Sequence, residues 1–214
     1  VDNIFTQLGE SCSKLNISLV GGHTEITYDL PRPIAVGSLI GEVDKSKVVL
    51  TSGIQPGDHI ILTKGVAIEG TAILAREASE RLETAGVKAE VIEKSRDFLF
   101  TPGISILHDA SITRNVTKVH AMHDPTEGGV ATGIIEMATA GNVGVNIDLE
   151  NIPILPECAE ICSVLGLNPL GLIASGSLLA AVSPEDSSTV IEALNKAGIA
   201  AANIGHATKP NKGL

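Results

Sequence analysis

The apolar part of this chain is almost entirely aliphatic, which restricts the folds that it can adopt. Apolar residues make up 43% of the 214 residues, but aromatic residues only 2%, with one Tyr, three Phe and no Trp. A core of Ile, Val, Leu and Ala is typical of proteins that layer helices against a sheet. Twenty-two glycines indicate tight turns or backbone that approaches a ligand. We therefore expect an α+β (α/β-layered) protein of one large or two small domains.

Short apolar runs alternate along the chain with segments of helical spacing. The strands that we expect are too few and irregular for an all-parallel sheet, which favours a mixed sheet. A turn-rich segment at 52–58 predicts a domain boundary, with residues 1–54 before it and residues 55–214 after it. The pattern predicts helices at 5–15, 69–84, 89–99, 102–113, 129–140, 156–165 and 184–197, and strands at 17–20, 33–43, 59–63, 119–122, 145–149, 177–182 and 201–206.

The charge and the cysteines exclude several classes of protein. A formal net charge of −10 shows no basic face for nucleic acid, so bound phosphates would need backbone amides, helix starts, a few lysines and metal ions. No apolar run approaches the ~20 residues that span a bilayer. Cys12, Cys158 and Cys162 give no disulfide framework, which predicts a cytoplasmic protein. Cys158 and Cys162 share a helix face, as metal ligands or as two small buried hydrophobes.

Three junctions between a strand and a turn are candidates for a binding site, and the first begins at Gly21. Gly21 and Gly22 allow the backbone to approach a ligand, and His23, Thr24 and Glu25 follow them. These three polar side chains can hold a metal ion or a phosphate. A plain β-turn with exposed polar residues explains the same pattern.

The second junction places Lys64 and Gly65 between a buried strand and a helix. A lysine beside a helix start suits an anion. The lysine precedes the glycines, however, so the spacing is not that of a Walker loop, and the three-glycine dinucleotide motif is absent.

The third junction, around Asp124, carries the clearest pattern. A strand leads to Asp124, Pro125 stiffens the turn, and Gly128 and Gly129 open a helix whose free amides point back at the same place. An aspartate beside an anion site is explained if Mg²⁺ lies between the two. In the alternative interpretation, Asp124 or Thr126 only caps the helix.

Together the three junctions resemble motifs of the aminoimidazole-ribonucleotide synthetase (AIR synthase, PurM-like) superfamily. Its members have a Gly-Gly-(Asp/Glu)-Thr element, a Ser/Thr-Gly loop and an Asp-x-Thr-x-Gly-Gly turn that opens a helix. The chain is most similar to the hydrogenase-maturation branch, HypE, in the turn at 124–129, the segment at 165–169 and the strand at 177–182.

The resemblance implies a two-domain PurM-like fold. Residues 1–54 would be the C-terminal part of an ATP-binding first domain, and residues 55–214 the second domain. It implies ATP and Mg²⁺ as cofactors, a homodimer, a small-molecule or protein-tail substrate whose amide or thiocarboxamide is activated, and a maturation partner protein. The implied metal ligands are Asp124, Glu25 and His23, and the implied nucleotide or phosphate contacts are Gly21, Gly22, Thr24, Lys64, Gly65, Thr126, Gly128 and Gly129.

Three residues depart from the family pattern. His23 replaces an acidic magnesium ligand, Glu127 replaces an arginine, and Ser175 replaces a glutamate that serves as a base in HypE. They leave the catalytic residues unassigned and two alternatives open: another superfamily activity, such as a small-molecule kinase or amidine-forming ligase, and a non-catalytic nucleotide-binding paralogue. Both chain ends are expected to be cut, so that part of the nucleotide site lies outside this sequence and the piece is inactive.

Overall fold

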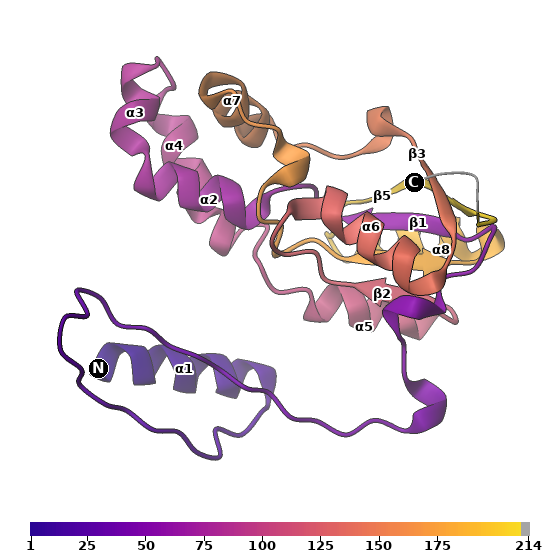
Figure 1. Cartoon of the computed structure of the whole chain (residues 1–214), viewed down its shortest axis with the longest axis horizontal. Helices are drawn as coiled ribbons and strands as arrows, with labels where there is room; N and C mark the ends of the chain where they lie inside the picture. The colour runs from indigo at the N-terminus through magenta and orange to yellow at the C-terminus, as the bar shows by residue number, and fades with distance from the viewer. Residues whose placement is uncertain (211–214) are drawn as a thin grey trace. The chain divides into compact units, whose positions relative to one another are not determined.

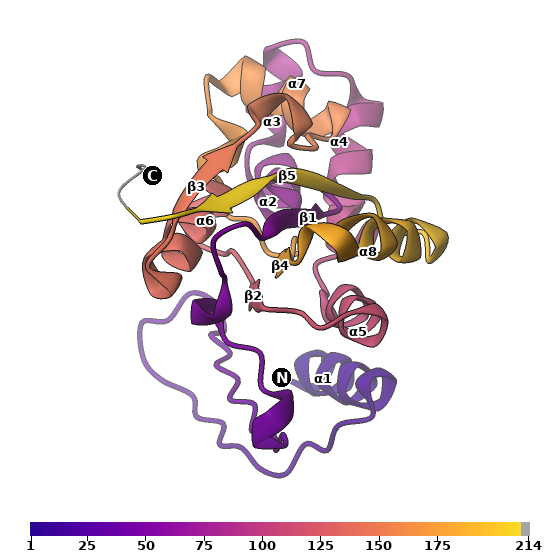
Figure 2. The same cartoon turned by 90° about the vertical axis from the view of Figure 1, so that its right-hand side faces the viewer.

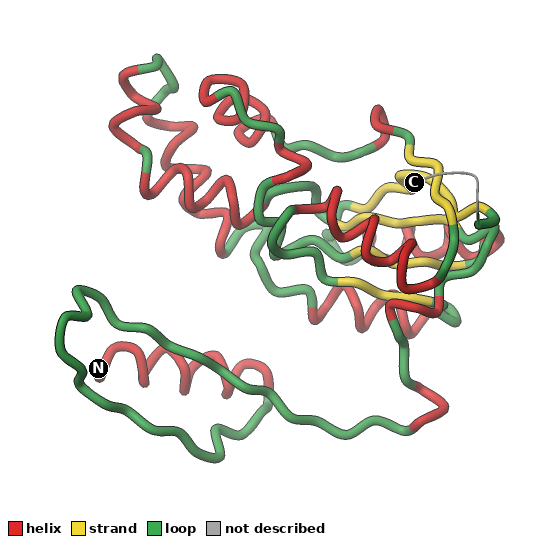
Figure 3. Tube along the Cα trace, viewed as in Figure 1, coloured by secondary structure: helices red, strands yellow, loops and turns green. Residues whose placement is uncertain are grey.

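The computed structural model describes residues 1–210, and the chain divides into two compact units, Val1–Glu42 and Val43–Leu214. The first unit holds helix α1 (Asp2–Leu15), which ends where Asn16 takes a left-handed conformation. The predicted helix at 5–15 is therefore confirmed and starts earlier. The rest of the first unit is an extended loop (Figure 3). The predicted domain boundary at residue 54 stays a prediction.

The strands predicted at 17–20 and 33–43 are wrong for the described structure. No residue of the first unit lies in a strand, and apolar side chains of the two segments are open to solvent, with Val20 94%, Val36 91% and Ile40 94% exposed. A strand needs a neighbour to accept and donate its backbone hydrogen bonds, and no described segment of this unit supplies one. Local sequence alone therefore did not make these segments strands.

The second unit is built on one five-stranded sheet with the order β2-β4-β1-β5-β3. Every pairing is antiparallel, so the expected mixed sheet is wrong in that detail, while the α+β class is confirmed. No two neighbours are consecutive in sequence, so the direction of a strand cannot be inferred from the strand before it. The strands are β1 (His59–Thr63), β2 (Ala121–His123), β3 (Gly144–Ile147), β4 (Leu179–Val182) and β5 (Ala201–Thr208).

Helices cover both faces of the sheet, as Figures 1 and 2 show. Side chains alternate along β1, so that Ile60 and Leu62 join a cluster with α6 (Gly129–Gly141), while Ile61 faces the other way. On that second face, α8 (Pro184–Lys196) buries Val190 and Leu194 against Ile61, and α5 (Leu107–Val116) contacts α8. The core is therefore aliphatic, as the composition predicts.

A third group of helices forms a separate cluster around Ala75, Leu82, Ile92 and Ile161. The predicted helix at 69–84 breaks at Ala78 into two, and the second half turns to bury Leu82. The group comprises α2 (Ile68–Glu77), α3 (Ser79–Thr84), α4 (Ala89–Arg96) and α7 (Pro156–Leu165). Short 3₁₀ turns lie at Lys45–Lys47, Thr51–Gly53, Asp97–Leu99, Leu149–Asn151 and Pro169–Gly171.

The remaining predicted helices are confirmed, but the one at 102–113 begins only at Leu107. Pro102 and Gly103 lie in a loop before it, and the carbonyl of Ser105 in that loop accepts a hydrogen bond from the ammonium of Lys64. Helices at 156–165 and 184–197 agree closely with the prediction, because each begins with a proline in its first turn. Over residues 1–210, no helix is long and apolar enough to cross a membrane.

Replacing Ile61 with Ala should test the sheet as the core of the second unit. Ile61 is fully buried in the central strand, so the Ile61→Ala variant should lose about 2–5 kcal/mol of unfolding free energy in urea denaturation. The control, Ile135→Ala on α6, removes a side chain that is 48% exposed and should lose less than ~1 kcal/mol. Equal losses would contradict the packing described here.

Candidate functional site

Two of the predicted junctions meet at one edge of the sheet. Strand β4 lies between β1 and β2 and runs antiparallel to both, so β1 and β2 point the same way. Lys64 follows the end of β1, and Asp124 follows the end of β2. The strand order therefore brings two predicted site residues, 60 positions apart in sequence, to the same edge.

The turn after β2 leads from Asp124 into α6 without a side-chain cap. Gly128 is the residue before the helix, it is left-handed, and no side chain caps the helix start. The interpretation of Asp124 or Thr126 as a mere side-chain cap is therefore not what the structure shows. The amide of Gly129 donates to the carbonyl of Thr126, so the amides of Val130 and Ala131 are the ones without a partner among the described residues.

Asp124 as a whole residue is exposed, but its carboxyl group is partly shielded from water and its pKa is raised. The main cause is partial burial, which disfavours the charged form, and Glu69 raises the pKa further. The charges of His123 and Lys64 act in the opposite direction. A divalent cation at this carboxylate would favour its charged form, because the positive charge offsets both the cost of burial and the repulsion from Glu69.

Gly129 fixes the turn against the segment at 170–172. Its φ of +69° favours glycine, and an added Cβ would lie 2.3 Å from the carbonyl oxygen of Leu170 and 2.6 Å from that of Leu172. On the other side of this segment, the amide of Gly70 in α2 donates to the carbonyl of Ile173 at 3.0 Å. The segment at 170–174 thus lies between the starts of two helices.

The loop that holds Lys64 and Gly65 is buried and satisfied by its own protein. The backbone amide of Lys64 donates to Ala200, that of Gly65 to Thr63, and that of Val66 to Pro153. The Lys64 ammonium lies 3.1 Å from Asp109, inside the protein. The phosphate contact predicted for Lys64 and Gly65 stays a prediction. The contacts that we observe for both residues are with other parts of the protein.

The first junction lies in the first unit, where its side chains are open to solvent. His23 Nε2 lies 3.6 Å from Glu25 Oε2, so two of the three polar side chains face each other. An added Cβ at Gly21 or Gly22 would meet no atom within 4 Å, and Thr24 is exposed. Across the described residues, no group of three His, Cys, Asp or Glu side chains is placed to hold a metal. The metal and phosphate roles predicted for this junction stay predictions.

Sequence reasoning missed the residues that support the β1 end. Asp109 is 1% exposed and pairs with Lys64, although the helix at 102–113 gave no reason to single it out. Ser177 donates a hydrogen bond to the carbonyl of Gly65, and the charge of Glu69 raises the pKa of Asp124. A buried aspartate in an otherwise amphipathic helix is a usable signal only once the helix face is known.

The cysteine pair belongs to the core. Cys158 and Cys162 are buried in the main cluster with their Sγ atoms 3.9 Å apart, and both are free thiols. A hydrogen bond from Cys162 lowers the pKa of Cys158 to about 7, and the same contact raises the pKa of Cys162. Since no third ligand joins the pair among the described residues, the interpretation as small buried hydrophobes fits best.

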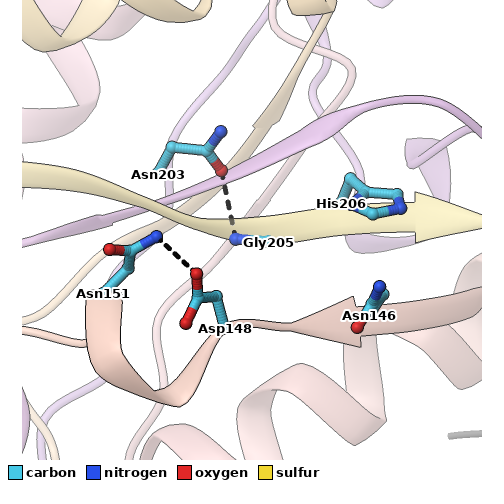
Figure 4. Close-up of a pocket in the computed structure, with 6 residues that line it drawn as sticks. All are labelled: Asn146, Asp148, Asn151, Asn203, Gly205 and His206. Carbon is cyan, nitrogen blue, oxygen red and sulfur yellow. Dashed lines mark hydrogen bonds between the residues drawn. The ribbon is translucent and has the colours of Figure 1, made fainter.

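A separate polar hollow of about 270 Å³ lies over β3 and β5 (Figure 4). Asp148 accepts a hydrogen bond from Asn151 at 2.8 Å, and Asn203 accepts one from the amide of Gly205 at 3.1 Å. Because these groups already serve one another, we do not assign the hollow a ligand. Its lining residues are Asn146, Asp148, Asn151, Asn203, Gly205 and His206.

Comparisons with known proteins agree on one family. A family model described as AIR synthase related protein, C-terminal domain, matches residues 55–213. The whole chain is 32% identical to a hydrogenase expression/formation protein of Methanocaldococcus jannaschii, of which it covers 61%. It is 27% identical over 96% of its length to the carbamoyl dehydratase HypE of Rhizobium leguminosarum, of which it covers 57%. The chain therefore spans roughly three fifths of these relatives.

A solved structure of the hydrogenase maturation protein HypE in complex with ATP has a similar fold. The TM-score is 0.59 at 21% identity, and the match covers 80% of this chain and 48% of that chain. At this identity the likeness concerns the fold alone.

Replacing Gly129 with Ala should disturb the turn before α6. The left-handed backbone and the two nearby carbonyl oxygens both oppose a Cβ, so the Gly129→Ala variant should lose at least ~2 kcal/mol of unfolding free energy. Gly171→Ala is the matched control, because Gly171 lies in the same contact and an added Cβ there meets nothing within 4 Å. Chemical denaturation measures both, and similar values would refute the packing argument.

Replacing Asp124 with Asn should slightly stabilise the ligand-free protein at neutral pH. The folded-state pKa of Asp124 is raised above 3.8, so the folded protein binds the proton more tightly than the unfolded chain does. The contribution of Asp124 to stability is therefore lost as pH rises from 3.8 through the folded-state pKa. Asp124→Asn removes this loss, and the stability that the variant gains over the parent should shrink as pH falls toward 3.8, the pKa of Asp124 in the unfolded chain. Urea denaturation at several pH values measures the difference, with the exposed Glu160→Gln as control. A variant less stable than the parent at pH 7 would indicate a capping role.

Proposed function

Because this chain belongs to the AIR synthase related family, we propose that the full protein uses ATP and Mg²⁺ to activate a carbamoyl or thiocarboxamide group, as in the hydrogenase-maturation branch. Two relatives support this branch, since one is named a hydrogenase expression/formation protein and the other a carbamoyl dehydratase. The ATP complex of a protein with the same fold supports the nucleotide. The site that we propose for the phosphates and the cation is the Asp124 turn.

One observation carries this proposal: an exposed aspartate, Asp124, precedes by five residues a helix start that no side chain caps. In the first turn of α6 the amides of Val130 and Ala131 have no partner among the described residues; Val130 is fully buried, so the amide of the half-buried Ala131 is the one that a ligand can reach. The helix dipole favours a negative group there. Asp124 would repel such a group unless a cation lay between them. Mg²⁺ suits the place because it prefers oxygen ligands and shares its coordination with substrate phosphates.

The residues fit Mg²⁺ held jointly with a phosphate, and they do not fit a site made by protein ligands alone. Among the described residues, no three metal-binding side chains converge. Bound at Asp124, Mg²⁺ would neutralise charge on the transferred phosphoryl group. The protein would hold Asp124 by the short β2 strand and the rigid Pro125 turn, and it would place the α6 amides beside the phosphate.

The reaction class that we propose is dehydration of a carbamoyl group. The carbonyl oxygen attacks the terminal phosphorus of ATP, and ADP leaves. The nitrogen then loses its protons, and phosphate departs with the oxygen, which leaves a nitrile. The protons pass to a base that we do not assign, and the phosphoryl step depends on positioning and charge stabilisation rather than on covalent help from the protein.

The alternatives are a different activity of the same superfamily and a non-catalytic nucleotide-binding paralogue, and Ser175 favours both over the first proposal. A hydroxyl group at this half-buried position cannot replace a carboxylate as a base near neutral pH. In a small-molecule kinase reaction the hydroxyl of the acceptor substrate attacks the phosphorus directly, so no base at this position has to remove the protons of an amide nitrogen. The homodimer, the maturation partner and the cytoplasmic setting belong to the first proposal.

Replacing Asp124 with Ala in the full-length protein should lower Mg-ATP turnover by at least about 100-fold. The physical reason is that the phosphates lose the carboxylate that faces the cation. Measured by phosphate release with and without a carbamoyl substrate, turnover should stay near the parent value in the Glu160→Ala control, since Glu160 is exposed on α7. Unchanged turnover in Asp124→Ala would remove this residue from the site. ATP consumption that responds only to a hydroxyl acceptor would favour the kinase alternative.

A further inference from the structure

Lys64 is a buried charge whose donors are all occupied by the protein. Its side chain is 6% exposed, and that of its partner Asp109 is 1% exposed, with Nζ 3.1 Å from Asp109 Oδ2. The same ammonium donates to the carbonyl of Ser105 at 2.7 Å and to that of Gly176 at 3.0 Å. An ammonium group has three N–H donors, so these contacts use all of them.

Asp109 extends the contact to both strands beside it. Its Oδ1 accepts a hydrogen bond from Thr63 Oγ1 at 2.6 Å, and the same hydroxyl accepts one from the amide of Leu178 at 3.0 Å. Ser177 donates to the carbonyl of Gly65. The Lys64–Asp109 pair therefore joins the end of β1, the start of β4 and the loop before α5, which are far apart in sequence.

A second set of contacts leads from this pair to the Asp124 turn. Gly176, which the ammonium holds, is two residues from Ala174, and the amide of Ala174 donates to the carbonyl of Thr126 at 3.2 Å. The same segment supplies the carbonyl of Leu170 that lies against Gly129. The segment at 170–178 thus connects the pair to both sides of the turn.

We propose that Lys64 and Asp109 are positioning residues, which hold the segment at 170–178 and through it the Asp124 turn in the geometry that binds Mg-ATP. Lys64 in this assignment touches no phosphate. The nucleotide part of the inference rests on the proposed function, whereas the effect on the segment does not. A direct phosphate ligand at Lys64 is the competing assignment, and it predicts that Asp109 matters little.

The first test compares Lys64→Met with Asp109→Asn in the full chain. Each variant leaves a buried charge without its partner, so the melting temperature should fall by about 10 °C in both. Hydrogen exchange of the peptide covering 170–178 should accelerate at least about tenfold in both, well below the melting temperature. Lys94→Met is the matched control, since it removes a lysine whose ion pair is with Glu157 on α7 and not with Asp109. Exchange at 170–178 should not change in the control.

A double variant, Lys64→Met with Asp109→Leu, separates positioning from stability. Replacing both charges with apolar side chains removes the unpaired charge, so at least half of the lost melting temperature should return. Exchange at 170–178 should nevertheless stay fast, because the carbonyls of Ser105 and Gly176 still lack their donor. The double variant also keeps the test decisive if either single variant does not fold.

Calorimetry with Mg-ATP on the full-length protein completes the test. Affinity should fall at least about fivefold in Asp109→Asn and in the double variant, although Asp109 is too buried to touch a ligand. The inference is overturned if exchange at 170–178 is unchanged in Lys64→Met, or if only the Lys64 variants lose affinity. Failure of the parent protein to bind Mg-ATP would sink the proposed function alone, since exchange and melting would still decide the positioning role.

Discussion

A charged group taken out of water must find partners inside the protein, and Lys64 imposes that requirement on this structure. Desolvating an ammonium costs several kcal/mol, which only a close carboxylate and further acceptors offset. The group therefore fixes Asp109, Ser105 and Gly176 around itself. These contacts add to the backbone hydrogen bonds that hold the three segments in register, because a shift of any segment would leave the charge without a partner.

The strand order decides which residues can cooperate. Strand β4 separates β1 from β2 and runs against both, so the two strands deliver Lys64 and Asp124 to one edge of the sheet. The helices α2 and α6 begin at that edge, and the segment at 170–174 lies between their first turns. Hydrogen-bonding and charged groups therefore gather at this edge, where the aliphatic core ends.

How much the sequence predicted depended on how local the cause was. The helix at 156–165 could be predicted because its proline start and apolar spacing lie within the segment itself. The Asp124 turn was recognisable for the same reason. Strand formation near Val20 and Val36 depends on a neighbour, which the segment does not contain. The ion pair of Lys64 depends on Asp109, 45 positions away, so the local pattern of a lysine beside glycines could not predict it.

The backbone around Lys64 is strained, which indicates that the buried ion pair has a role beyond filling the core. Lys64 and Ala67 both take left-handed φ angles, of 59° and 54°, which cost a non-glycine residue roughly 1–2 kcal/mol each. An apolar core has no need for such strain, and apolar residues of similar size often replace buried pairs without loss of stability. Strain of this kind persists where the geometry that it maintains is needed. Here that geometry is the alignment of the segment at 170–178 with the Asp124 turn, so stability and site geometry are set by the same few contacts.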